Sequence, residues 1–437
     1  MNKKEKFFSV MKKVGTGAQK FSKNYLNYTV ILAVMLVFTI FALATPMKDS
    51  TALLFQKITV AVILAVSLNF VVGFLGELSL GHAGFMAVGA FLGGKLSTIL
   101  VNALGANSTN IFILILSLVL GAVCAAVCGV VVGFAALRLR GDYLAIVTLA
   151  FGEIVRVVFI NSSYDNAINK INATKLPEFI KNFFAKILEL LDFGGALGLQ
   201  SPSFPKKKMY ILVIIGFLLI LFTLFVIQNI LKSKTGRAIT AIRDNEIAAK
   251  AMGIDVTKHK LMVFVISAAF AGMAGVLFSY ANKPVSASSF GYNYSIEILI
   301  MVVLGGMGSI NGSIISASLI TILNEFLSKK LTGDNAIYKD LFYAVILILV
   351  IIYNNAPALK NLREKLNLKN LVGKLFNKIF KRKPNPSSVA SDAARWDVVP
   401  TKIEMNEVLS TDVVIDYTGE NSADIDERGG SDNGKEN

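Results

Sequence analysis

Five ionisable side chains stand inside long apolar stretches of the sequence: Glu77, His82, Glu153, Arg156 and Glu297. An ionisable group within a membrane is costly, and it usually lines the path of a polar solute or carries a proton or an ion. Glu153 also precedes Arg156 by three residues, so this pair could instead neutralise itself as a structural contact. The set as a whole indicates transport, and both interpretations stay open for the pair.

Other kinds of site lack the residues that they need. The sequence has two histidines, two cysteines and no Cys/His/Asp/Glu cluster, so a metal has no ligand set. Cys124 and Cys128 lie four residues apart in one apolar run, which favours packing over a disulfide. No nucleophile stands with a base. The G-x-x-x-x-G-K-[ST] loop that holds ATP phosphates is missing from the sequence, so we do not expect this chain to bind ATP through such a loop. We therefore expect no catalytic residue, metal or cofactor in this chain.

Glycine clusters interrupt two of the apolar stretches. They are Gly73, Gly76, Gly81 and Gly84 in the first and Gly305, Gly306, Gly308 and Gly312 in the second. Such density disfavours a continuous helix, and a helix broken in mid-membrane exposes backbone groups that can hold a polar solute. The paired breaks suggest two structural repeats. The predicted substrate-pathway residues are Gly76, Glu77, Ser79, Gly81, His82, Thr148, Glu153, Glu297, Gly305 and Gly306.

One polar internal segment, residues 235–260, has the pattern of a helix. Ala238–Met252 is rich in alanine and other helix formers, and Gly253 stands where a left-handed helix cap belongs. Its apolar residues Ile239, Ile242 and Ala249 recur close to one helical face. Such a face could seat in a groove on another protein, or the segment could be an ordinary amphipathic surface helix.

These residues need a membrane scaffold. Hydrophobic residues make up 54% of the 437 residues, charged residues 17%, and the mean hydropathy is +0.61. That composition predicts an all-α, polytopic bundle of about ten spans, since a span takes roughly 20 apolar residues. The predicted spans are Thr29–Ala44, Leu53–Phe74, Leu80–Leu100, Ile111–Leu137, Tyr143–Ile160, Met209–Leu231, Leu261–Ala281, Ser295–Met307, Ser313–Leu327 and Leu341–Tyr353.

Charge distribution predicts the orientation and the terminal segments. An even number of spans places both termini on one side, and the basic residues beside the first and last spans make that side the cytoplasm. Basic clusters that flank apolar spans suit anionic membrane lipid and do not form a nucleic-acid surface. The predicted parts are a basic cytoplasmic segment 1–28, a membrane domain 29–355 with a cytoplasmic loop 232–260, a basic interfacial helix 356–383 and an acidic, disordered cytoplasmic tail 384–437.

Small residues recur every four positions along one predicted span. They are Gly121, Ala125, Gly129 and Gly133. A face of small residues lets another helix approach closely, either from a second subunit or from within the chain. The sequence alone leaves both choices open.

Four segments, in order along the chain, carry a resemblance to a known family. Glu246, Ala248, Ala249 and Gly253 look like the EAA-type cytoplasmic loop of ABC importer permeases, and the string from Gly236 to Gly275 resembles the branched-chain amino acid ABC permeases. Residues 73–91, 139–158 and 295–313 are similar to that family's other signature segments. The likeness covers roughly residues 53–353.

The resemblance implies a permease subunit in a bacterial inner membrane that imports a branched-chain amino acid. It implies as partners a homologous second permease, two ABC ATPase subunits that bind the ATP and an extracytoplasmic substrate-binding protein. The residues that it assigns to ATPase coupling are Arg237, Arg243, Glu246, Ala248, Ala249 and Gly253. Position 77 departs from the family, because glutamate stands where glutamine is more usual, and this adds a charge beside the pathway.

Two alternatives remain open from the sequence. Within the same class, the substrate could be urea, a short amide or another amino acid. In another class, an autonomous ion-coupled transporter or channel would use Glu77, Glu153 or Glu297 as proton or ion sites. The EAA-type loop favours the first class, because a transporter without an ATPase needs no docking helix.

Overall fold

The computed structural model describes residues 49–104, 110–136, 142–162, 193–202 and 209–330, with 344, 345 and 348. All of these belong to one compact unit, Met1–Asn355. The predicted span Thr29–Ala44, the basic segment 1–28 and the segments 356–383 and 384–437 lie outside the described residues. Most of the predicted span Leu341–Tyr353 lies outside them as well.

The described part of the chain is built from helices. Two helical stretches contain a π-helical turn: α2 (Asp49–Asn69) continues into η1 (Phe70–Leu75), and α3 (His82–Val88) passes through η2 (Gly89–Gly93) into α4 (Gly94–Leu104). The other long helices are α5 (Ile111–Ala136), α6 (Asp142–Asn161), α9 (Met209–Lys232), α12 (Val256–Ala281) and α14 (Ile310–Lys330). The short ones are α10 (Lys234–Asp244), α11 (Glu246–Ala251), α13 (Tyr292–Gly305) and the 3-10 turns η3 (Gly195–Leu197) and η5 (Ala287–Phe290).

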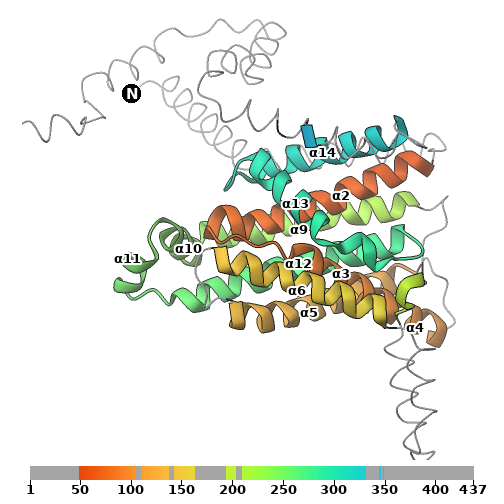
Figure 1. Ribbon diagram of the computed structural model, residues 1–437, viewed down its shortest axis with the longest axis horizontal. Helices are drawn as coiled ribbons and strands as arrows, with labels where there is room; N and C mark the ends of the chain where they lie inside the picture. Colours follow the sequence, from red (N-terminus) through yellow and green to blue (C-terminus); the bar gives the residue numbers. More distant parts are fainter. Residues whose placement is uncertain are drawn as a thin grey trace, which may run out of the picture. The chain divides into compact units, whose positions relative to one another are not determined.

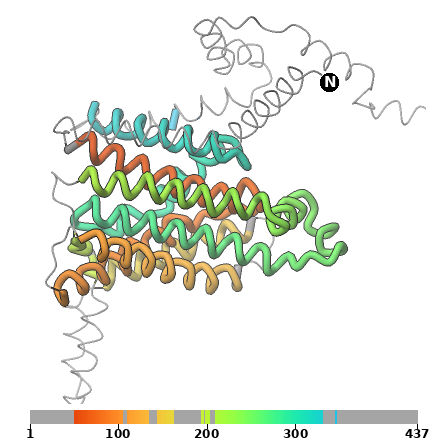
Figure 2. Tube along the Cα trace, turned by 180° about the vertical axis from the view of Figure 1, so that it is seen from behind, coloured from red at the N-terminus to blue at the C-terminus, as the bar shows by residue number. Residues whose placement is uncertain are grey.

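Seven helical stretches in the described residues are long and apolar enough to cross a bilayer, and α13 is a shorter apolar helix. They correspond to eight of the ten predicted spans, so the all-α, membrane-spanning fold is confirmed. The long helices lie side by side, with α14 beside α2 at one edge and α5 at the other, while α10 and α11 project beyond one end (Figures 1 and 2). We call this the loop end.

Close contact between α5 and α12 answers the question about the small residues. A Cβ on Gly129 would lie 2.8 Å from the Ala268 Cβ, and one on Gly272 would lie 2.5 Å from the Ala125 Cβ. The small face of α5 therefore packs inside the chain against α12.

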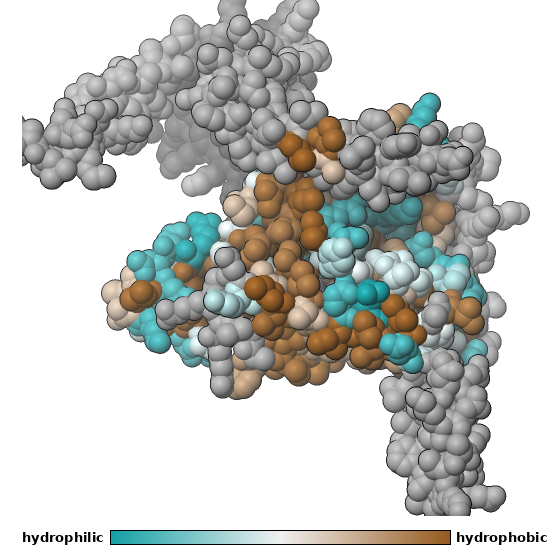
Figure 3. Space-filling model, in the orientation of Figure 1, coloured by the Kyte–Doolittle hydropathy of each residue, from teal (hydrophilic) through white to brown (hydrophobic). Residues whose placement is uncertain are grey.

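The outward face of α5 is apolar instead. Val119, Val123 and Val127 recur every four residues and are 54%, 52% and 57% exposed. Figure 3 shows apolar residues across the middle of the helices and hydrophilic residues over α10 and α11. A protein that exposes apolar side chains along whole helices is suited to lipid rather than water.

Candidate functional site

The two glycine breaks lie against each other at the loop end. Asn69, the last residue of α2, joins them: its side chain accepts a hydrogen bond from the Gly308 amide and donates one to Ser313 Oγ, both at 2.9 Å. Gly76, Gly306 and Gly308 have φ angles of +83°, +90° and +81°, a region that glycine adopts without strain. The breaks thus form one joint, which we call the glycine joint (residues 73–81 and 305–309).

The first break connects the span Ser50–Leu75 to the span His82–Leu104. It begins beside the loop and runs back along α2, because His82 is hydrogen-bonded to Ser67, which lies eight residues before Leu75. Irregular backbone is also found at η2, within the span His82–Leu104.

Arg243, in the last turn of α10, connects the loop to the glycine joint. Its Nη1 donates to the Gly73 carbonyl at 3.1 Å, and its Nη2 contacts Asp244 at 3.2 Å. A Cβ on Gly76 would lie only 2.8 Å from the Arg243 Cγ, so this close approach needs glycine. Part of the Arg243 guanidinium is therefore used inside the chain rather than at its surface.

Lys260 makes a second connection between the same parts. Its side chain is 5% exposed, and its Nζ donates to Glu77 in the glycine joint and to Glu246 Oε2 of α11, the latter at 3.0 Å. A buried ammonium needs such partners, because an unpaired charge away from water is very costly. One lysine at the start of α12 thus binds the glycine joint to α11.

The loop contains two helices, where the sequence predicted one helix over Ala238–Met252. Asn245 separates α10 from α11: its backbone is extended (φ −158°, ψ 106°), and its side chain accepts a hydrogen bond from the Ala248 amide at 3.0 Å. Asparagine is a strong N-cap, and this preference outweighed the helix-forming residues around it. Gly253 has φ +81°, so the predicted left-handed conformation is confirmed.

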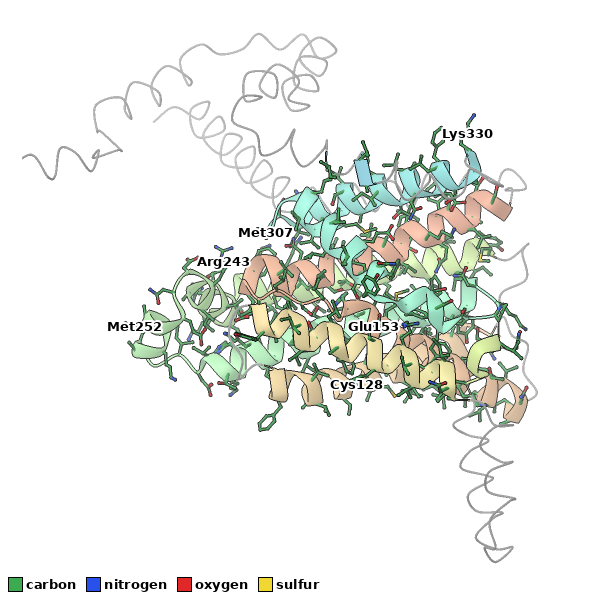
Figure 4. All side chains as sticks on the ribbon, viewed as in Figure 1. Cys128, Glu153, Arg243, Met252, Met307 and Lys330 are labelled. Carbon is green, nitrogen blue, oxygen red and sulfur yellow. The ribbon has the colours of Figure 1, made fainter. Side chains whose placement is uncertain are left out.

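The apolar face of the loop is buried within this chain. Ile239, Ile242 and Ala249 are 0%, 3% and 4% exposed, so this face is covered by the chain itself and is not free for a partner's groove. Ile247 and Met252 are instead 75% and 83% exposed. Ala248 and Arg237 are exposed as well. Figure 4 shows Met252 at the outer edge of the loop and Arg243 nearer the spans.

Three of the predicted pathway residues lie between helices. Ser79, His82 and Thr148 are at most 2% exposed. The Leu80 amide donates to Thr148 Oγ1 at 3.0 Å, and His82 Nε2 lies 2.8 Å from Ser67 Oγ in a hydrogen bond. These contacts hold the segment after the first break against α2 and α6.

The other two acidic pathway residues line one cavity. Glu153 and Glu297 lie in the lining of a space of about 620 Å³ between α6, α13 and α14, together with Arg156, Tyr292 and Asn324. Arg156 Nε donates to Glu153 at 2.7 Å, and the Tyr292 amide donates to the other Glu153 oxygen at 2.8 Å. The pair is therefore a structural contact that also lines the cavity.

Sequence reasoning missed several residues of this arrangement. Asn69 and Lys260 join the breaks and the loop, and Lys57, Asn324 and Glu325 line a second cavity. Asn69 and Lys57 are polar residues in or beside an apolar run, and this is the feature that identified the glutamates as candidates. The sequence could therefore have indicated both residues. Lys260 stood within a basic loop, where nothing distinguished it from a solvated lysine.

Comparisons with known proteins agree with this picture. A family model described as "Branched-chain amino acid transport system / permease component" matches residues 50–351. The permease protein LivM of the high-affinity branched-chain amino acid transport system of Escherichia coli is 36% identical over 313 residues, which cover 71% of this chain and 70% of the relative.

More distant relatives match shorter stretches. The probable branched-chain amino acid permease LivH of Methanocaldococcus jannaschii is 30% identical over 187 residues, 43% of this chain and 53% of the relative. The ribose import permease RbsC of Escherichia coli is 30% identical over 129 residues, 28% of this chain and 39% of the relative. No solved structure matches. The bundle, the ordered motifs and these matches together confirm the resemblance: the chain belongs to the permease family of branched-chain amino acid transport systems.

Proposed function

We propose that this chain is the membrane-spanning permease subunit of an ATP-driven importer that moves branched-chain amino acids into the cytoplasm. Its family and the names of its LivM and LivH relatives support the substrate class. The other parts of the system are a homologous second permease, two ATPase subunits that bind the ATP, and an extracytoplasmic binding protein. The loop end faces the cytoplasm, as do both termini.

One observation carries the proposal: α11, which has an exposed surface, is joined to the glycine joint by the ion pairs of a buried lysine. Glu246 of α11 and Glu77 of the joint share Lys260, and Arg243 adds a second tie to Gly73. Ile247 and Met252 stand exposed on the loop, away from these ties. An exposed apolar pair on the surface of the loop is suited to a partner's groove.

The ties give a route from ATP to the spans. When ATP closes the two ATPase subunits, the α11 segments of the two permeases move together. Lys260 and Arg243 pass this displacement to residues 73–81, and Thr148 passes it to α6 through the Leu80 amide. The spans on either side of the joint then change their angle, which opens the pathway away from the cytoplasm.

The principal alternatives differ in substrate and in class. The match to a ribose permease covers little of the chain, so it supports the class of transporter rather than a sugar substrate. Urea, short amides and other amino acids remain alternative substrates. An autonomous ion-coupled transporter would need an acidic residue that exchanges ions, and Glu77 is less suited to this because Lys260 already neutralises it.

The test is co-purification with the proposed ATPase subunits. We expect Ile247→Asp to insert normally but to lose at least about tenfold of the bound ATPase, because it places a charge in the centre of an apolar contact. The control is Thr257→Asp, which puts the same charge on the exposed first turn of α12. If Ile247→Asp retains the ATPases and imports substrate normally, α11 is an ordinary surface helix and the autonomous transporter becomes the better interpretation.

A further inference from the structure

Two adjoining cavities lie at the end of the bundle opposite the loop. The 620 Å³ cavity described above is lined mostly by polar side chains that are half-buried or exposed, and the second, of about 290 Å³, lies deeper between α2, α13 and α14. They share one wall, made by Ser289, Tyr294, Glu297 and Asn324. We call them the outer and the inner cavity. Figure 3 shows hydrophilic residues gathered over α13 where the outer cavity opens.

The two cavities differ in their linings. The outer cavity carries the charges of Glu153 and Arg156. The inner cavity has buried apolar lining, with Val60, Ala61 and Met86 each at most 3% exposed, and it is also lined by the ion pair of Lys57 with Glu325 at 2.7 Å. Charged groups on the surface of a membrane protein cannot face lipid without great cost, so the outer cavity must open to water.

We propose that the two cavities form a binding subsite for a zwitterionic amino acid with a branched aliphatic side chain. The ammonium group binds to Glu297, the carboxylate binds to Arg156, and the side chain occupies the inner cavity. The inference rests on the proposed function and deepens it, because it places a recognition step in the permease itself rather than only in the binding protein.

The charged groups are suited to both ends of the ligand. Glu297 Oε1 accepts a hydrogen bond from Asn324 Nδ2 at 3.0 Å, and a carboxylate has about four acceptor positions, so an ammonium can be added without breaking this bond. Arg156 donates to Glu153 through Nε, and a guanidinium has five donors in a fixed fork. The Tyr292 amide holds Glu153, which in turn holds Arg156 in place.

The inner cavity is suited to the side chain. Its volume of about 290 Å³ lies near the lower end of small-molecule cavities, which are on the order of 300–1,000 Å³, and it has room for a branched aliphatic side chain. Phe290 forms a firm wall, since its ring contacts those of Phe278 and Phe91 at centroid distances of 5.4 and 5.9 Å.

Binding of L-leucine to the assembled permease and ATPase complex, in phosphatidylethanolamine and phosphatidylglycerol nanodiscs without the binding protein, tests the subsite. Two analogues separate the contacts: L-leucinamide lacks the carboxylate, and 4-methylpentanoate lacks the ammonium. We expect the parent complex to bind leucine at least about tenfold more tightly than either analogue, the loss that follows one charge-assisted hydrogen bond. Glu297→Gln should lower the affinity for leucine to about that for 4-methylpentanoate. Arg156→Gln should lower the affinity for leucine to about that for L-leucinamide.

Matched variants guard against simple misfolding. Glu297→Asp keeps the carboxylate and should retain part of the preference for leucine over 4-methylpentanoate. Ala61→Phe fills the inner cavity, so it should weaken the binding of leucine and leave the binding of L-alanine unchanged. Equal affinity for leucine and both analogues would overturn the subsite, as would leucine binding that all of these variants leave unchanged. Binding that follows sodium concentration rather than the two charged groups would also overturn it.

Failure of the subsite and failure of the proposed function give different results. If the complete system with its binding protein imports leucine on ATP but the complex alone shows no Glu297-dependent binding, only the subsite fails. If the complex binds leucine as described but ATP drives no import, the proposed function fails and the subsite stands.

Discussion

Lys260 is the residue on which the link between loop and spans most depends. Its side chain is 5% exposed, while those of Glu77 and Glu246 are 14% and 38% exposed. Removal of one partner from a buried ion pair costs about 3–5 kcal/mol, because the remaining charge is left without compensation. Glu77 would bear most of this cost, since Glu246 reaches water.

Replacement of Lys260 should separate ATP hydrolysis from transport. We expect Lys260→Met to lower the thermal stability of the purified chain and to abolish substrate-stimulated ATP hydrolysis in the complex. Lys258→Met, two residues earlier on the exposed side of α12, is the control and should change neither. The double variant Lys260→Met with Glu77→Gln should regain stability, because no charge is left unpaired, but not the coupling. Normal coupling in Lys260→Met would show that the ion pairs only support the fold.

At this scale the sequence identified the acidic residues but not their partners. Glu77, Glu153 and Glu297 were recognisable because each interrupts an apolar stretch. Lys260 lies 183 positions from Glu77, and the pairing between them depends on how α12 packs beside the first break. A single sequence does not contain that information, so the pairing of Glu77 with Lys260 was not predicted.

Helix contacts, rather than space in a pathway, explain why Gly81 must be glycine. A Cβ there would collide with the carbonyl of Thr148 on α6. Gly152, on the facing side of the same contact, is different, because its Cβ would lie 3.7 Å from the Gly81 Cα, an ordinary van der Waals distance. The two glycines therefore form a matched pair for substitution.

We expect Gly81→Ala to reduce transport strongly, at a cost of about 1–3 kcal/mol in packing, while Gly152→Ala remains close to the parent. Transport rates at equal expression levels, with ATPase co-purification as a check on assembly, measure the difference. Equal transport by both variants would contradict the contact between the first break and α6.

The helices themselves were largely predictable, and their interruptions only partly. Long apolar runs identified eight described spans or short helices within a few residues, because length and hydropathy decide membrane insertion. Glycine density located both breaks. The break at Asn245 was missed, since one capping side chain decided it within an alanine-rich segment. The π-helical turn η2 depends on close packing against α12 and has no comparable sequence signal.

On the scale of the whole described unit, coupling and recognition lie at opposite ends. The glycine joint meets α10 and α11 at one end, and the two cavities lie near the start of α13 and the last turns of α14. The sequence could not predict this separation. Glu77 and Glu297 are both acidic residues in apolar stretches, and the sequence does not show at which end of the bundle each one lies. Long helices connect the ends, so displacement at the loop can alter the cavity without direct contact.

The loop end should face the cytoplasm. Asp244 is well suited to test this, because its side chain is 70% exposed. In sealed cells, a cysteine introduced by Asp244→Cys should resist an impermeant thiol reagent and should react once the membrane is opened. The native Cys124 and Cys128 are changed to alanine beforehand, and a cysteine at exposed Asn293, near the opposite end, serves as the control that reacts in sealed cells. Labelling of Asp244→Cys from outside would reverse the orientation.

The most direct test of the account is leucine uptake into proteoliposomes that contain this chain with its permease and ATPase partners and the binding protein. We predict accumulation of radiolabelled L-leucine that requires ATP, that is lost in Lys260→Met and that persists in Lys258→Met. Accumulation by this chain alone, driven by a sodium or proton gradient and indifferent to ATP, would contradict the account.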